Sequence, residues 1–76
     1  MSGAKIDKLA RMANQIGDAF STAPQPEAVR SAATHLRLYW TPKMIREIVT
    51  YLDTGGASLN AIAAGAVATL KKDDVG

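Results

Sequence analysis

Residues 35–44 read HLRLYWTPKM, and this stretch predicts how the rest of the chain is arranged. It holds the only Trp and the only His of the 76 residues. Pro42 disfavours helical geometry at Thr41, so a helix that runs through Leu36 is expected to end near Trp40. Thr41 can then cap a new helix with Pro42 at its first position, where a missing backbone N–H costs nothing. The stretch therefore predicts two helices that meet at a tight corner, with a buried Trp at the bend.

Apolar residues recur at three- and four-residue spacing on both sides of this corner, whereas no run alternates with the period of two that strands require. Gly55-Gly56 is expected to end the helix that follows Pro42, and Ser58 is expected to cap the next one. The sequence therefore predicts one all-α domain over residues 1–76, a small bundle of about four short helices. The predicted helices cover residues 5–20, 26–40, 42–53 and 59–70, and residues 71–76 are predicted to form a frayed tail.

The fourth predicted helix has an unusual composition, because no residue from Thr54 to Leu70 is charged and Ala dominates. It is too short and too weakly apolar to span a bilayer, which takes about 20 apolar residues. A helix that is apolar all round is normally buried all round, yet a 76-residue domain is expected to have too little protein to surround it. Two alternatives follow: its Ala methyl groups face water, or another chain covers them.

Composition excludes several classes of protein. The chain has no Cys, which excludes disulfides and thiolate metal sites, and one His makes no metal cluster. A net charge of +2 is small for a dedicated nucleic-acid binder. Residues 1–20 contain charged side chains that interrupt any secretory signal, so we expect a cytoplasmic protein. A domain this small has a marginal core unless a partner supports it.

No arrangement of residues predicts catalysis. His35 has no Ser or Cys placed to form a triad with it, so it is interpreted as a structural or interface residue rather than a general base. The acidic residues are dispersed singly, which does not suit paired acid–base chemistry. We therefore predict no catalytic, cofactor-binding or metal-binding residue in this chain.

Several blocks of the sequence together resemble one family. They are Met12-Ala13-Asn14-Gln15-Ile16-Gly17, His35-Leu36-Arg37, Tyr39-Trp40, Pro42 with Met44, Gly55-Gly56 and Leu59. In order and spacing they resemble the delta subunit of the NAD-dependent formate dehydrogenases, the multi-subunit molybdenum or tungsten enzymes that oxidise formate to CO2. The resemblance extends over roughly Lys5 to Leu70.

This resemblance implies a non-catalytic accessory subunit that binds no cofactor itself and associates with the large catalytic subunit. The implied complex carries a bis-guanine-dinucleotide molybdenum or tungsten cofactor, iron–sulfur clusters, FMN and NAD, with flavin and iron–sulfur subunits that oxidise NADH. The implied role is to support assembly of the complex, cofactor insertion or stability. The resemblance implies no binding to nucleic acid or to a membrane. A small helix-turn-helix nucleic-acid-binding protein is the alternative, since Arg37, Lys43 and Arg46 lie near the corner.

Two groups of side chains are expected to contact the catalytic subunit. The first lies on the first helix, away from its apolar stripe, although plain solvation is the alternative interpretation of that polar face. The second lies close to the corner, where a solvated helix would carry Lys or Glu in place of Leu. The predicted partner-binding residues are Arg11, Asn14 and Gln15 in the first group, and His35, Arg37 and Leu38 in the second.

Overall fold

The computed structural model describes the backbone of residues 2–75 and the side chains of residues 5–73. This part of the chain is helical throughout and contains no strand, so the predicted all-α fold class is confirmed. The first two helices begin and end within a few residues of the predicted bounds, and the third matches them. The helices are α1 (Ser2–Ala19), α2 (Gln25–Tyr39), α3 (Pro42–Asp53) and α4 (Ala61–Val75).

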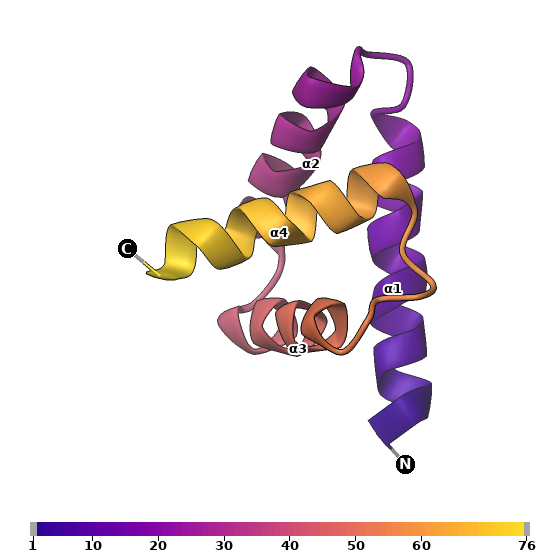
Figure 1. Cartoon of the computed structure of the whole chain (residues 1–76), viewed down its shortest axis with the longest axis vertical. Coiled ribbons are helices and arrows are strands. Elements are labelled where there is room, and N and C mark those ends of the chain that lie inside the picture. The colour runs from indigo at the N-terminus through magenta and orange to yellow at the C-terminus, as the bar shows by residue number, and fades with distance from the viewer. Residues whose placement is uncertain (1, 76) are drawn as a thin grey trace.

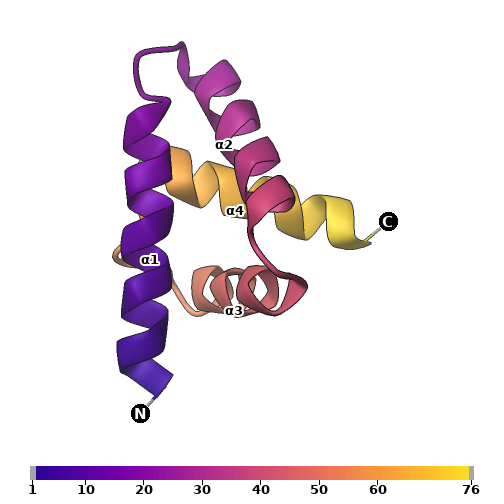
Figure 2. The same ribbon diagram turned by 180° about the vertical axis from the view of Figure 1, so that it is seen from behind.

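Helix α4 crosses one side of a layer that the other three helices form. In Figure 1, α1 and α2 run away from the loop that joins them and spread apart, and α3 lies across their open end. Figure 2, seen from behind, places α4 on the far side of α1 and α2. Helix α4 packs against all three other helices. The core therefore lies between α4 and the layer that it crosses.

The corner between α2 and α3 forms as the sequence predicts. Trp40 has an extended backbone, with φ −92° and ψ 145°, and ends α2. The Thr41 side chain accepts a hydrogen bond from the Met44 backbone N–H at 3.2 Å, so it caps α3, and Pro42 occupies the first turn. These are local signals, which explains why the start of α3 can be predicted from neighbouring residues alone.

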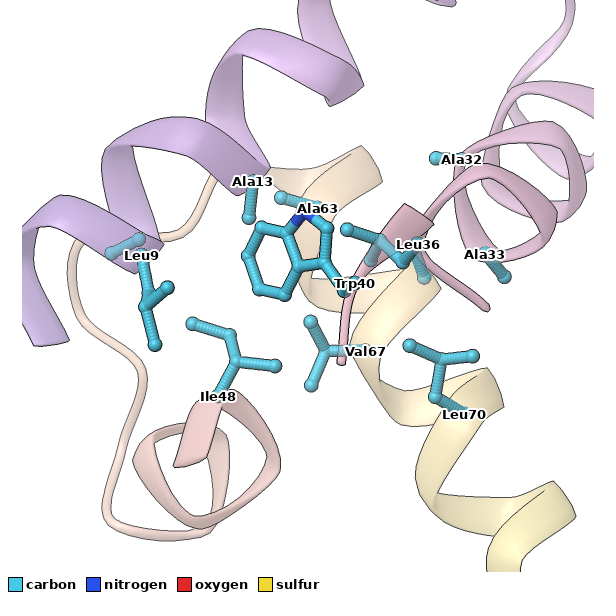
Figure 3. Close-up of a cluster of buried hydrophobic side chains, with 12 residues drawn as sticks. Leu9, Ala13, Ala32, Ala33, Leu36, Trp40, Ile48, Ala63, Val67 and Leu70 are labelled. Atoms are coloured by element: carbon cyan, nitrogen blue, oxygen red, sulfur yellow. The ribbon is translucent and has the colours of Figure 1, made fainter. Parts of the chain in front are cut away.

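Trp40 lies in the core, as predicted, with 7% of its surface exposed. In Figure 3 its indole ring lies among side chains from all four helices, including Leu9, Leu36, Ile48 and Val67. An aromatic ring of this size buries more apolar surface than any of the Ala residues around it. The corner thus turns the largest side chain of the chain toward the centre of the fold.

Helix α3 also ends where the sequence predicts. Gly55 and Gly56 have positive φ angles of 123° and 54°, which side chains with a Cβ rarely adopt. The Gly56 N–H donates to the Tyr51 carbonyl and the Gly55 N–H donates to the Leu52 carbonyl, both at 3.0 Å. This is the Schellman arrangement that ends many helices. It turns the chain toward the start of α4.

The start of α4 differs from the prediction, because Asn60 and not Ser58 is its cap. The Asn60 Oδ1 atom accepts a hydrogen bond from the Ala63 N–H at 2.8 Å, and the Asn60 carbonyl accepts the Ala64 N–H. The Ser58 carbonyl instead accepts the Asn14 Nδ2 at 2.7 Å. The helix begins at Ala61 rather than 59 because Asn60 is held there by α1, a tertiary contact that local pattern does not show.

The predicted frayed tail is wrong for residues 71–75, which continue α4 as a helix. Two ion pairs attach this last part of α4 to other helices. The Lys71 Nζ lies 2.5 Å from an Asp53 carboxylate oxygen on α3, and Asp73 pairs with Arg37 on α2. Gly76, the last residue of the predicted tail, lies outside the described residues.

As expected, this chain covers one side of α4 but does not surround it. Ala63, Ala66, Val67 and Leu70 of α4 are buried against the other helices. A Cβ at Gly65 would lie 2.9 Å from the Val29 Cγ2 atom, so α2 approaches α4 closely at this point. Exposed methyl groups remain only on the outer side of the helix, among the residues described. They belong to Ala61 and Ala68.

Candidate docking surface

The last turn of α2 exposes two large apolar side chains. Leu38 is 70% exposed and Tyr39 is 71% exposed. Every other large apolar side chain among residues 5–73 is buried or partly buried. Leu38 faces outward because it follows buried Leu36 by two residues, about 200° around a helix of 3.6 residues per turn. The corner then turns the next residue, Trp40, inward. Two adjacent apolar side chains are therefore left on the surface.

His35 connects Tyr39 to the end of α1 through aromatic contacts. Its ring centroid lies 4.6 Å from that of Tyr39, with an interplanar angle of 43°, and 6.2 Å from that of Phe20 in an edge-on arrangement. His35 and Tyr39 meet because they are four residues apart on one helix. We call Phe20, His35, Leu38 and Tyr39 the aromatic patch.

A shallow hollow of about 470 Å³ accompanies the aromatic patch. All four patch residues line it, and polar residues of α2 complete its wall. Large apolar groups beside a few polar ones are the composition expected at the centre and rim of a protein interface. The remaining lining residues are Glu27, Arg30, Ser31 and Thr34.

The described contacts of His35 are contacts of packing. A catalytic base is commonly held by a hydrogen bond to a Ser, Asp or Glu side chain. Within residues 5–73 no such bond involves the His35 ring. No group of three or more His, Asp or Glu side chains in this part of the chain is placed to hold a metal ion.

Arg37 lies on a different side of α2 from the aromatic patch. Its guanidinium pairs with the Asp73 carboxylate of α4, and both side chains are about half exposed. Arg37 also lines a second hollow, which contains Trp40 rather than His35. Although Arg37 and Leu38 are neighbours in sequence, the fold separates their side chains.

The three predicted residues of α1 have different surroundings. Asn14 binds the α3–α4 connection with both ends of its amide: Nδ2 donates to the Ser58 carbonyl, and Oδ1 accepts the Asn60 N–H at 2.8 Å. Arg11 and Gln15 are exposed to solvent. Among residues 5–73 no hydrogen bond, ion pair or aromatic contact joins these α1 residues to the predicted residues of α2.

Phe20 and Tyr39 belong to the patch, although sequence reasoning did not select them. The signal for Tyr39 was present, since it follows the candidate His35 by four residues and the candidate Leu38 by one. Phe20 lies in the turn after α1, and only the packing of α1 against α2 brings it to His35. A contact of that kind has no local signature.

None of the described helices has the combination of length and apolar character needed to cross a membrane. The described residues form a small helical protein that exposes two large apolar side chains at the end of α2. Its sequence places it in a family: a model of the NADH-dependent formate dehydrogenase delta subunit (FdsD) family matches residues 8–67, well over half of the chain. The chain belongs to this family. No curated protein and no solved structure matches it.

Proposed function

We propose that this delta subunit binds the large catalytic subunit of a formate dehydrogenase complex through the aromatic patch. Membership of the delta-subunit family supports the complex, and the exposure of Leu38 and Tyr39 supports the surface. The exposure of these two side chains is the observation on which the proposal chiefly rests. On this proposal the subunit is not catalytic by itself, works in the cytoplasm, and supports assembly, cofactor insertion or stability.

The proposal assigns all redox chemistry to other subunits. The large subunit holds the bis-guanine-dinucleotide molybdenum or tungsten cofactor, and the flavin and iron–sulfur subunits carry FMN, the clusters and the NAD site. This chain supplies contact area instead. Tyr39 is suited to that role because its ring is rigid, buries a large apolar area and keeps a polar hydroxyl at its end.

Tyr39 is the expected anchor of the interface. Tyr is enriched among the few residues that dominate binding energies, whereas Leu is under-represented among them. A projecting side chain of the partner can fill the hollow beside Tyr39. Leu38 and Phe20 enlarge the apolar area around the anchor and exclude water from it. Arg11 and Gln15 remain candidates for a second, polar contact on α1.

The test is co-purification of the large subunit with the tagged chain carrying Leu38→Ala and Tyr39→Ala. Loss of a central aromatic anchor costs about 2 kcal/mol or more, which is about 30-fold in affinity. The helical circular dichroism should not change, because both side chains are exposed. Lys8→Ala, on the exposed side of α1, is the matched control and should retain the large subunit.

Arg11→Ala with Gln15→Ala tests the α1 group separately. Full recovery of the large subunit would remove these two residues from the interface. Full recovery by the Leu38 and Tyr39 variant would contradict the aromatic patch. Failure of the unaltered chain to recover any large subunit would contradict the proposed function itself.

A further inference from the structure

Helix α3 leaves both of its basic side chains, and α4 leaves Lys72, without an ion-pair partner within residues 5–73. Every acidic side chain described on these helices is already paired: Glu47 with Lys5 at 3.5 Å, Asp53 with Lys71 at 2.5 Å, and Asp73 with Arg37. Lys43 and Arg46 of α3 are exposed and have no ion pair within residues 5–73. They are three residues apart on one helix face, so their charges project from the same side. We call them the basic ridge.

The basic ridge separates two apolar hollows. Arg46 lines both of them, and Lys43 lines the second. The first hollow, of about 550 Å³, lies between α2, α3 and α4 and contains Trp40, Val49 and Leu70. The second, of about 660 Å³, contains Ile6 and Tyr51. Unneutralised positive charge thus lies directly beside apolar depressions, on residues that the aromatic patch does not include.

We propose that the basic ridge binds an acidic segment of another subunit in the same complex. Carboxylates of that segment pair with Lys43 and Arg46, and an apolar side chain of the segment enters the hollow beside Trp40. The inference rests on the proposed function, because it takes the partner to be a subunit of the enzyme. It adds a second contact surface with a partner of stated chemistry.

Charge complementarity identifies the occupant as an acidic polypeptide segment. The guanidinium of Arg46 presents a planar set of donors that fits a carboxylate in two hydrogen bonds. Asp73 and Glu47 line the two hollows. A polyphosphate backbone carries a negative charge on every unit, including those beside these carboxylates, whereas a polypeptide can place an uncharged apolar side chain there. In a segment that alternates carboxylates with apolar groups, the carboxylates can pair with the basic ridge while the apolar groups fill the hollows.

A carbodiimide that joins amines to carboxylates without a spacer tests this contact in the purified complex. Such a reagent links only groups that are in ion-pair contact, so Lys43 should be linked to an Asp or Glu of another subunit. Arg46→Lys places a second amine on the ridge, which should link to the same segment. The Lys71–Asp53 pair within this chain is the internal positive control. Lys8, outside both hollows, should give no link between subunits.

Affinity supplies a second readout. Lys43→Gln with Arg46→Gln should weaken binding about tenfold at low salt, and the difference should vanish near 1 M salt, where the screening length is about 3 Å. Lys8→Gln with Lys72→Gln removes the same charge elsewhere and should change binding little.

Three results would overturn the inference. The first is the internal Lys71–Asp53 link without a Lys43 link to another subunit, and the second is Lys43 linked only to carboxylates of this chain's own sequence. The third is equal weakening by the two double variants. If the complex still forms through the aromatic patch, these results reject the basic ridge alone. If no large subunit is recovered with the unaltered chain, both proposals fail.

Discussion

Asn60 makes three hydrogen bonds with its side chain, and two of them join the start of α4 to the C-terminal half of α1. Its Oδ1 accepts the Ala63 N–H at 2.8 Å, and its Nδ2 donates to the Asn14 carbonyl and to an Asp18 carboxylate oxygen, each at 3.3 Å. A Cβ at Gly17 would lie 2.8 Å from the Asn60 Oδ1, so this contact needs a glycine on α1. One amide thus caps a helix and fixes its position.

Asn60→Ala is expected to lower the free energy of unfolding by about 1–2 kcal/mol, the usual cost of losing a helix cap. In a domain of this size each kcal/mol lowers the melting temperature by about 4–8 °C. Thermal melts followed by circular dichroism measure the effect. Ser58→Ala is the matched control, because its backbone and not its side chain makes the described hydrogen bonds. An equal loss in both variants would contradict the assignment of the cap.

Helix α4 depends on close approach to α2 at Gly65. Gly65→Ala gains about 1 kcal/mol of helix propensity, but its Cβ would lie 2.9 Å and 3.3 Å from the two methyl carbons of Val29. Val29 cannot turn away readily, because a β-branched side chain in a helix strongly prefers one rotamer. Overpacking of this kind costs about 1–3 kcal/mol. We therefore expect the substitution to destabilise the chain.

A double-mutant cycle identifies the cause of that effect. Val29→Ala removes both methyl groups, so the combined variant should be more stable than the sum of the two single changes predicts. Denaturant melts of the four proteins give the coupling free energy. Strict additivity would show that α2 and α4 do not meet at this position.

The core of the whole chain is small and rich in alanine. Seven of the 13 buried apolar residues described are Ala, each of which buries one methyl group. Burial of about 60% of the unfolded surface is typical of a domain this small, and leaves it marginally stable. The side chains of the three described ion pairs are about one third to one half exposed, and surface pairs of this kind contribute about 0–1 kcal/mol each. The free energy of unfolding of the isolated chain is therefore expected to be small.

We expect the isolated chain to be weakly folded and to gain stability in its complex, since a partner that binds only the folded state shifts the equilibrium toward it. Calorimetry of the free chain and of the complex measures this. Ordinary domains melt near 45–65 °C. A cooperative melt of the monomeric chain above about 80 °C would contradict the expectation.

Two of the four residues of the aromatic patch, His35 and Leu38, are among the predicted partner-binding residues, whereas Phe20 and Tyr39 are not. Leu38 was placed on the surface from its position opposite the apolar side of α2, and its exposure confirms that placement. Whether it contacts a partner stays a prediction. Arg37 and Asn14 are both predicted to bind a partner subunit, yet within this chain Arg37 pairs with Asp73, and Asn14 binds the α3–α4 connection. Their partners lie 36 and 44 residues away along the chain, where no periodic pattern connects them.

The sequence by itself determined the all-α class, the corner at Thr41-Pro42 and the end of α3 at Gly55-Gly56. The class follows from apolar residues that recur at three- and four-residue spacing. The corner and the helix end depend on backbone geometry and hydrogen bonds within about five residues, so neighbouring residue types suffice to specify them. Only the tertiary structure decided where α4 begins, how its Ala-rich surface is covered, and which aromatic side chains gather beside His35. These features depend on contacts between helices, and their energies come from groups that folding alone brings together.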